Sequence, residues 1–432
     1  MLPLYSFLLT IAFILMSPLF ILRRQKYASG FRQRLGNYPE FKQDGREVIW
    51  LHAVSVGEAN AARPLVDKLL AEFPNHRVVI STTTKTGQEL AQNIFRNKAD
   101  AVFYFPFDWK FSVKKALDNY KPSLVLLMET EIWPRFIYEA KKVGARVAIV
   151  NGRVSEKSFQ RYSYVRGFVS RVLEDVDLAL MQGDKDAERI RRLGIDGEKI
   201  SIPGNLKFEQ PDNEDDGVTE YLKDRFGFED GRPLIIAAST HDPEEERVID
   251  AYKQVCKYFD ARLMIAPRHP ERFDSVAKIL RDTGLQFARR SEAESGNDKN
   301  AHVILLDSIG ELRAVYPLGD IVFVGGSLIP HGGQSIIEPA AAGKAVITGP
   351  YTHNFADVVR EFVEHDALIE LREGGADDGV PGLVEAFEKL LVDTPRREEL
   401  GQRAFEVMQR NRGATQATID RLREFVSKSG AA

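Results

Sequence analysis

Three glutamates stand where acid–base chemistry is possible. Glu58 follows the turn His52–Gly57, and Glu129 and Glu131 lie two residues apart in the segment Met128–Pro134. Both segments come directly after predicted strands, and a carboxylate at the carboxyl end of a parallel strand can act as a general base. Glu58 also has a plainer interpretation, because the helix dipole stabilises a glutamate in the first helical turn. If the strand continues past Met128, alternation sends Glu129 and Glu131 to one side, which favours a functional site.

Basic side chains that suit a negatively charged ligand follow other predicted strands. Lys207 lies in the segment Gly204–Phe208, and Arg268 lies in Pro267–Phe273, between a predicted strand and a predicted helix. An arginine in such a turn can pair with a phosphate through two hydrogen bonds. From the residues alone, Lys207 is best explained as an ordinary surface lysine, and Arg268 is explained equally well as a surface arginine.

A glycine-rich segment further along the chain is suited to a nucleotide. The apolar run Ile321–Val324 predicts a buried strand, a loop with Gly332 and Gly333 follows, and a short helix is expected over Ser335–Ala342. Glycine lets the backbone approach a ligand, and the free N–H groups at a helix start attract phosphate.

Two S-x-x-E patterns in this half of the chain have two interpretations each. Ser335 with Glu338, and Ser308 with Glu311, fit a capping box, in which the glutamate returns to the backbone of the serine. In the functional alternative, Glu338 instead binds the ribose hydroxyls of a nucleotide.

Alternating strand and helix patterns must position these residues, and they predict two doubly wound, mostly parallel sheets. We expect a first domain over residues 47–208, a linker over 209–232 and a second domain over 233–432. The first strands are predicted at Val48–Val54, Arg77–Thr83, Ala101–Phe105, Leu124–Met128, Val147–Val150, Leu178–Met181 and Ile200–Pro203. The second series is predicted at Pro233–Ser239, Leu263–Ala266, His302–Leu306, Ile321–Val324, Ala345–Thr348 and Ala367–Glu370.

The first 46 residues predict a membrane anchor with a basic segment behind it. Leu2–Leu22 carries no charged residue, and about 20 apolar residues cross a bilayer. Residues 1–46 hold seven Lys and Arg against two Asp and Glu, which favours anionic headgroups and keeps the following domain in the cytoplasm. Pro3 and Pro18 interrupt the pattern, so the segment either spans the bilayer or lies in its interface. A buried core helix is the alternative.

Composition excludes several classes of site. A net charge of −4 gives no support to nucleic-acid binding. Cys256 is the single cysteine, so an internal disulfide and a cysteine-rich zinc site are excluded. The eight histidines show no metal-binding spacing, and we expect no metal and no cofactor.

Several separated segments together resemble one family. HAVSVGE, METEIWP, GNLKF, PRHPERF and GGSLIPHGGQSIIEPAAAGKAVITGP occur here in the order found in the 3-deoxy-D-manno-octulosonic acid (Kdo) transferases. The resemblance implies the GT-B fold, with two Rossmann-like domains facing across a cleft. It implies that Glu58 is the catalytic base, that either Glu129 or Glu131 assists the transition state, and that Lys207 stabilises the negative donor. Of the two glutamates we favour Glu131.

The same resemblance places the donor nucleotide on the second domain. It implies contacts from Pro267, Arg268 and His269, and backbone contacts to cytidine monophosphate (CMP) from Gly310, Glu311 and Leu312. The segment Ser335, Ile336, Ile337 and Glu338 would complete this site, with the Glu338 carboxylate on the ribose.

The implied activity is inverting transfer of Kdo from CMP-Kdo to the lipid A precursor at the cytoplasmic face of the inner membrane. CMP-Kdo is then a substrate, and anionic lipid headgroups are a further partner. Two alternatives stay open: another GT-B enzyme that uses a UDP-sugar as a transferase or 2-epimerase, and a non-catalytic sensor of nucleotide sugars.

Overall fold

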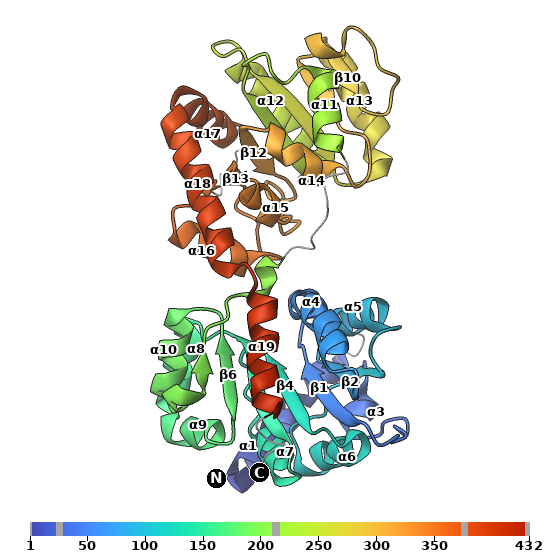
Figure 1. The fold of residues 1–432 in the computed structure, drawn as a ribbon, viewed down its shortest axis with the longest axis vertical. Coiled ribbons are helices and arrows are strands. Elements are labelled where there is room, and N and C mark those ends of the chain that lie inside the picture. The colour runs from blue at the N-terminus through green and yellow to red at the C-terminus, as the bar shows by residue number, and fades with distance from the viewer. Residues whose placement is uncertain (1, 23–28, 210–216, 373–378, 428–432) are drawn as a thin grey trace. The chain divides into compact units, whose positions relative to one another are not determined.

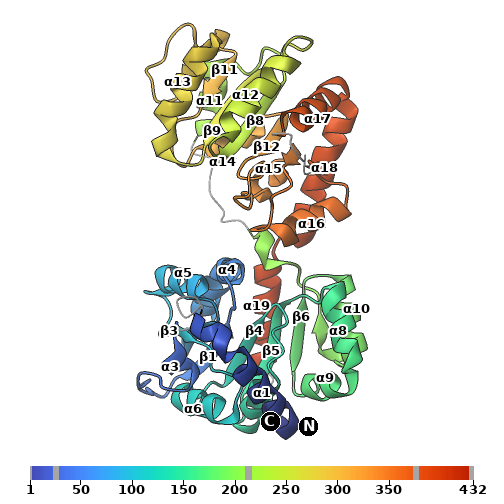
Figure 2. The same cartoon turned by 180° about the vertical axis from the view of Figure 1, so that it is seen from behind.

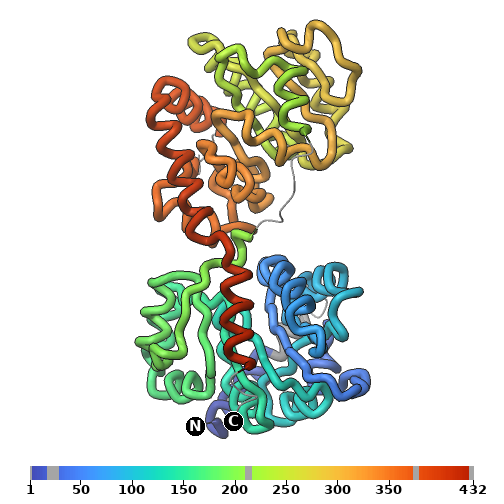
Figure 3. The backbone as a smooth tube through the Cα atoms, in the orientation of Figure 1, coloured from blue at the N-terminus to red at the C-terminus, as the bar shows by residue number. Residues whose placement is uncertain are grey.

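The computed structural model describes residues 2–22, 29–209, 217–372 and 379–427. The chain forms two compact units, which we call the first unit (Met1–Glu209 with Asn411–Ala432) and the second unit (Gln210–Arg410). Figure 1 shows the elements of each unit, and Figure 3 traces the chain as it returns to the first unit after the second. Two parallel α/β sheets were predicted, and two are found.

The unit boundaries differ from the expected ranges at two places. The final helix, α19 (Ala414–Ser427), was expected in the second domain but packs on the first unit, because Ala414, Ile419 and Leu422 are buried in that unit's core. Within the expected linker 209–232, α11 (Val218–Phe226) is a helix of the second unit that buries Leu222 and Phe226. Residues 210–216 of that linker lie outside the described residues.

The first unit has a seven-stranded parallel sheet in the order β3-β2-β1-β4-β5-β6-β7. Its strands are β1 (Glu47–His52), β2 (His76–Thr82), β3 (Ala101–Tyr104), β4 (Leu124–Met128), β5 (Arg146–Gly152), β6 (Leu178–Met181) and β7 (Ile200–Ser201). Its helices are α1 (Leu2–Leu22), α3 (Phe31–Arg34), α4 (Val56–Glu72), α5 (Lys85–Phe95), α6 (Lys110–Tyr120), α7 (Pro134–Lys142), α8 (Glu156–Tyr164), α9 (Arg166–Leu173), α10 (Asp184–Leu193), η1 (Gly197–Lys199), η2 (Leu206–Phe208) and α19.

Alternating side chains of these strands enter separate cores on the two faces of the sheet. Trp50 and Leu127 belong to one core, whereas Leu51 and Leu126 belong to the other. Burial on both faces explains why the strands read as continuous apolar runs. His52 of β1 pairs in register with Ser81 of β2 and Leu127 of β4, so these strands end at a common edge.

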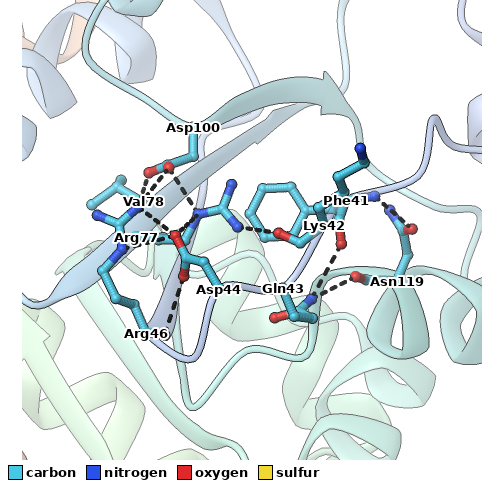
Figure 4. Close-up of polar contacts among 9 residues, drawn as sticks. All are labelled: Phe41, Lys42, Gln43, Asp44, Arg46, Arg77, Val78, Asp100 and Asn119. Atoms are coloured by element: carbon cyan, nitrogen blue, oxygen red, sulfur yellow. Dashed lines mark hydrogen bonds and ion pairs between the residues drawn. The ribbon is translucent and has the colours of Figure 1, made fainter.

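The opposite edge of this sheet is closed by polar contacts (Figure 4). Arg77 donates from Nε to Asp100 Oδ1 at 2.8 Å and from Nη1 to the Lys42 carbonyl at 2.5 Å. The Gln43 amide donates to the carbonyl of Asn119 at 3.0 Å. These bonds connect the segment before β1 to the starts of β2 and β3 and to the end of α6. The titratable side chains of the candidate site lie in loops at the other edge, where the strands end.

The second unit also has a seven-stranded parallel sheet, in the order β10-β11-β9-β8-β12-β13-β14. Its strands are β8 (Leu234–Thr240), β9 (Arg262–Pro267), β10 (Phe287–Arg289), β11 (Val303–Leu305), β12 (Ile321–Val324), β13 (Ala345–Thr348) and β14 (Ile369–Glu370). Its helices are α11, α12 (Glu244–Val255), η3 (Pro270–Arg272), α13 (Phe273–Thr283), η4 (Asp298–Asn300), α14 (Leu312–Val315), η5 (Tyr316–Leu318), α15 (Ile337–Ala341), α16 (Ala356–Glu364), α17 (Val380–Val392) and α18 (Thr394–Asn411).

The N-terminal helix α1 packs along the first unit (Figure 2). The Tyr5 hydroxyl donates to Asp108 at 2.9 Å, Arg135 donates to the Ser6 hydroxyl at 3.1 Å, and the Tyr5 and Phe168 rings are stacked with centroids 5.8 Å apart. Within residues 2–22, 29–209, 217–372 and 379–427, no helix combines the length and apolarity needed to cross a membrane.

The expected membrane-anchor helix is therefore not supported as a spanning segment. The polar contacts of Tyr5 and Ser6 direct one face of α1 to the protein, a role that charge counting could not predict. Apolar side chains on α1 remain exposed, namely Leu4, Phe7, Leu8, Ile11, Ile14, Leu15 and Met16. Arg23, Arg24 and Lys26 lie outside the described residues.

Candidate active site

The three predicted glutamates meet at the point where the strand order of the first sheet reverses. From β1 the chain builds β2 and β3 on one side and then returns to place β4 on the other. In open α/β sheets, ligands bind in the crevice beyond the carboxyl ends of the strands at such a switch point. Glu58 follows β1, and Glu129 and Glu131 follow β4.

Glu58 is both a cap of its own helix and a perturbed acid. Its carboxylate accepts the Val54 N–H at 2.7 Å and the Ser55 hydroxyl at 3.0 Å, while Ser55 caps the start of α4. The side chain is only 6% exposed. Burial, followed by the nearby charge of Glu129, raises the pKa of Glu58 to about 8 against the opposing hydrogen bonds. A carboxyl group with a pKa in this range suits proton transfer near neutral pH.

Glu129 and Glu131 reach this site from a strained turn instead of a continuing strand. The strand β4 ends at Met128, and Glu129 and Thr130 have φ angles of 56° and 98°. Positive φ is costly for a β-branched residue, and such strain concentrates at functional sites. Burial, followed by the charge of Glu129, raises the pKa of Glu131. Alternation along a strand therefore does not explain why the two carboxylates lie together; the turn does.

Lys207 completes the cluster from η2. Its ammonium lies 2.6 Å from Glu129 Oε1, and the two side chains are 16% and 21% exposed. The structure thus brings together four residues that the sequence spaces widely: Glu58, Glu129, Glu131 and Lys207. Three carboxylates and one ammonium in a partly buried site can accept a proton and oppose developing charge.

Three asparagines hold the turn that carries Lys207. Asn151, fully buried at the end of β5, accepts the Leu206 N–H at 2.9 Å, and Asn205 accepts the Lys207 N–H at 3.0 Å. Asn411 accepts the Asn205 N–H at 3.0 Å. The side-chain oxygen of Asn151 therefore positions the turn that carries Lys207.

The predicted donor residues of the second unit follow β9, β11 and β12, at the carboxyl edge of a sheet whose strand order reverses between β8 and β12. Pro267 is the buried last residue of β9, and Arg268 and His269 follow it as exposed residues. The Arg268 N–H donates to the Thr240 carbonyl at 2.9 Å, which ties this turn to the end of β8. The phosphate-binding role of Arg268 stays a prediction.

The two S-x-x-E segments do not form capping boxes. Ser308 donates to Glu311 Oε2 at 2.5 Å and Arg290 pairs with Glu311 Oε1 at 2.8 Å, so Glu311 fixes the turn that carries Gly310 and precedes Leu312. Gly310 has a φ of 89°, which favours glycine.

The other segment starts its helix later than predicted. The helix α15 covers only Ile337–Ala341, with Ile336 at its N-cap, because the Ser335 hydroxyl accepts the Ile337 N–H at 3.4 Å in place of a cap to Glu338. Burial raises the pKa of Glu338, and Arg313 opposes this. The capping interpretation of Glu338 is therefore wrong, and its carboxylate is left available for another partner.

Sequence reasoning missed His241 and Glu244, which follow β8. Glu244 and Glu245 lie at the start of a helix, where glutamates commonly stabilise the helix dipole, so the sequence gives no sign that they have another role. The strand-to-helix turn at Thr240–Glu244 was the signal that could have found them. By contrast, His52 is a buried core residue, and its ring stacks on Phe105. This burial lowers the pKa of His52 to about 3.

Comparison with known proteins points to one family. Residues 29–210 match the family described as 3-Deoxy-D-manno-octulosonic-acid transferase (kdotransferase). The chain is 36% identical over 407 residues to the 3-deoxy-D-manno-octulosonic acid transferase of Haemophilus influenzae, covering 94% of this chain and 93% of the relative.

One solved structure agrees with the two-sheet architecture over most of the chain. UDP-GlcNAc 2-epimerase from Neisseria meningitidis aligns with a TM-score of 0.51 over 88% of this chain and all of that one, at 13% identity, which shows the fold alone. The C-terminal CMP-Kdo binding domain of WaaA from Acinetobacter baumannii is 32% identical, covering 44% of this chain and 96% of that chain, with a TM-score of 0.40. The architecture resembles that of GT-B enzymes.

Proposed function

Because this chain belongs to the 3-deoxy-D-manno-octulosonic acid transferase family, we propose that it transfers Kdo from CMP-Kdo to the lipid A precursor in lipopolysaccharide synthesis. The observation that carries the proposal is the perturbed Glu58 at the switch point of the first sheet, beside Glu129, Glu131 and Lys207. A nucleotide-sugar sensor has no need of a buried acid poised for proton transfer. The second unit supplies the nucleotide site, through Arg268 and the glycine-rich loop after β12.

In the proposed mechanism, Glu58 in its ionised form accepts the proton of an acceptor hydroxyl. The hydroxyl oxygen forms a bond to the anomeric carbon of Kdo as the bond from that carbon to the CMP oxygen breaks. CMP leaves with the electron pair, and the configuration at the anomeric carbon inverts. Positive charge develops at that carbon in the transition state, and the Glu131 carboxylate stabilises it.

Lys207 and Arg268 act on the negative charge of the donor. Lys207 is held by Glu129 at 2.6 Å, and its positive charge opposes the negative charge that develops on the leaving group. Arg268, exposed at the end of β9, pairs with the phosphate. The helices α14 and α15 are too short to contribute a helix dipole of consequence, so backbone N–H groups of the Gly310 and Ser335 turns serve as individual donors.

We further propose that the protein works at the cytoplasmic face of the inner membrane, where the lipid acceptor resides. Support comes from α1, which presents Leu4, Leu8, Ile14 and Leu15 to the outside while Tyr5 binds the first unit. Such a helix lies in the interface with its apolar face among the acyl chains. The charge balance of residues 1–46, seven basic against two acidic residues, favours anionic headgroups.

A reconstituted reaction tests the proposal. The purified full chain is incubated with a tetraacylated lipid A precursor and freshly made CMP-Kdo, with EDTA present, and the lipid is weighed by mass spectrometry. We expect a gain of one or more Kdo masses with the wild type and none with Glu58→Gln. Glu58→Gln should still bind CMP, and Glu89→Gln on the exposed face of α5 is the matched control that keeps activity. Turnover by Glu58→Gln near the wild-type rate contradicts the assigned base, and preference for UDP over CMP contradicts the donor.

A further inference from the structure

Three histidines converge at the carboxyl edge of the second sheet. His241 follows β8, His269 follows β9, and His331 lies in the loop after β12. The His241 ring lies 4.1 Å from the His331 ring and 5.2 Å from the His269 ring, centroid to centroid. We call these three residues the histidine cluster. The three histidines follow three adjacent strands of the sheet, although they are far apart in sequence.

The cluster lies where this sheet is expected to bind a ligand. The strand order reverses between β8 and β12, and His241 and His331 follow these two strands. The backbone of β8 is shaped for this placement, because Ser239 has a φ of 53° and the register with β9 shifts between Ala238 and Thr240. A Cβ at Gly326 would lie 3.3 Å from His241 Cδ2, so glycine there leaves room for the ring.

Glu244 holds the two loops of the cluster together. Its buried carboxylate accepts four backbone N–H groups, from His241 at 3.0 Å, Gly326 at 2.6 Å, Ser327 at 2.9 Å and Leu328 at 2.8 Å. A carboxylate has about four lone-pair sites. Glu244 is thus fully used by the backbone and is not the counter-ion of the imidazoles.

The remaining charged groups around His241 are mostly cationic. Arg268, His269 and His331 face it, and the Gln334 amide nitrogen lies 3.2 Å from His241 Nε2. Burial, followed by the effects of His331, His269 and Arg268, lowers the pKa of His241 to about 4.

The carboxylates that flank the cluster have other partners. Asp242 pairs with Arg272 at 3.0 Å, and Glu245 pairs with the same arginine at 3.3 Å. In the described part of the second unit, no carboxylate therefore forms an ion pair with the histidine cluster. A cluster of donors that lacks negative charge is suited to a bound oxyanion.

We propose that the histidine cluster is an oxyanion subsite of the donor site, and that His241 takes up a proton when the anion binds. The inference rests on the proposed function, which supplies two candidate oxyanions: the nucleotide phosphate and the sugar carboxylate. A bound anion next to the His241 imidazole favours the charged form of the ring. It thereby opposes the burial and the neighbouring cations that keep the free imidazole neutral. Affinity for the anion then rises as the pH falls toward 6, because the charged imidazole is present only in the complex.

Calorimetry of CMP binding tests this, with the full chain and two buffers that differ in ionisation enthalpy. We expect wild-type protein to take up protons from the buffer at pH 6.5. His241→Asn, which cannot be charged, should bind CMP about tenfold or more weakly and lose the uptake. His331→Asn, at an exposed position, tests the same cluster without touching the core. His365→Asn, at the exposed C-cap of α16, is the matched control, and cytidine, which has no phosphate, should bind all variants alike.

The variants also distinguish the two oxyanions. Weaker CMP binding by His241→Asn and His331→Asn assigns the phosphate. Unchanged CMP binding with a KM for CMP-Kdo raised about tenfold assigns the sugar carboxylate. Unchanged CMP binding, KM and proton uptake in both variants overturns the inference while the proposed function stands. Failure of the wild type to bind CMP contradicts the proposed donor and this subsite together.

Discussion

The Lys207 ammonium lies 2.6 Å from the Glu129 carboxylate, at the end of a turn that bends away from β4. This ion pair joins the two parts of the candidate active site: the carboxylate that perturbs Glu58 and the cation proposed to meet the donor. Its position means that Glu129 acts on both. One substitution at Glu129 should therefore change both the acid–base behaviour of Glu58 and the placement of Lys207.

We predict that Glu129→Gln moves the pH profile of kcat/KM to lower pH. Glu58 must be ionised to accept a proton, so wild-type kcat/KM should rise with pH and reach half of its maximum near pH 8, the pKa of Glu58. Removing the Glu129 charge removes the second-largest cause of that raised pKa. The profile is measured from pH 5.5 to 9.5. Glu131→Gln should shift it less, since its charge contributes less, and an unmoved profile in Glu129→Gln excludes this coupling.

Glu58→Gln should stabilise the first unit at high pH. The folded-state pKa of Glu58, about 8, is above the ordinary value of 4.5, so folding favours the protonated form. Wild-type stability is then lost as the pH rises from about 4.5 to 8, and the glutamine variant does not share that loss. We expect a gain on the order of 1–3 kcal/mol at pH 9 and little gain at pH 5. Thermal melting at both pH values measures it, and equal differences at the two values would refute it.

Asn151→Ala should loosen the Lys207 turn. The substitution leaves the buried Leu206 N–H without its acceptor and places alanine at a φ of 53°. Together these cost about 2–4 kcal/mol. Asn151→Gly tolerates the backbone angle and isolates the cost of the lost hydrogen bond. Both variants should raise the KM for CMP-Kdo, whereas a KM unchanged in either one removes Asn151 from the positioning of Lys207.

Leu8→Ser combined with Leu15→Ser should weaken binding to anionic vesicles. The two side chains are 55% and 74% exposed, so the fold loses little, while lipid contact loses about 1–2 kcal/mol for each. Co-sedimentation with vesicles that contain phosphatidylglycerol measures the loss, expected to be 10-fold or more by this estimate of about 2–4 kcal/mol. Val392→Ser, 70% exposed on the second unit, is the matched control. Equal binding by the double variant and the control would exclude α1 as the lipid-binding element.

The strands were the most predictable part of the fold. Leu124–Met128, Leu178–Met181, Ile321–Val324 and Ala345–Thr348 begin and end as the apolar runs do, because strands buried on both faces admit few polar residues. The helix predicted from Ser335 begins later, since a serine can bond to the N–H two residues on as readily as cap a helix.

Contacts between distant residues could not be predicted. The pairing of Glu129 with Lys207, and the four N–H groups on Glu244, depend on how strand ends come together in space. The sequence pattern of a glutamate at a helix start is the same whether its side chain faces water or binds the backbone of two loops. Tyr5 and Ser6 likewise carry no sign of the polar contacts that bind α1 to the first unit.

The return of α19 to the first unit has a consequence for synthesis. Ala414, Ile419 and Leu422 complete a core that also holds Leu51, Leu126 and Leu206. These residues leave the ribosome only after the whole second unit has been translated, so the nascent first unit exposes part of its core throughout that time. Domains usually fold in the order in which they emerge. Here the second unit can finish first, and the first unit completes this core only when α19 has been translated.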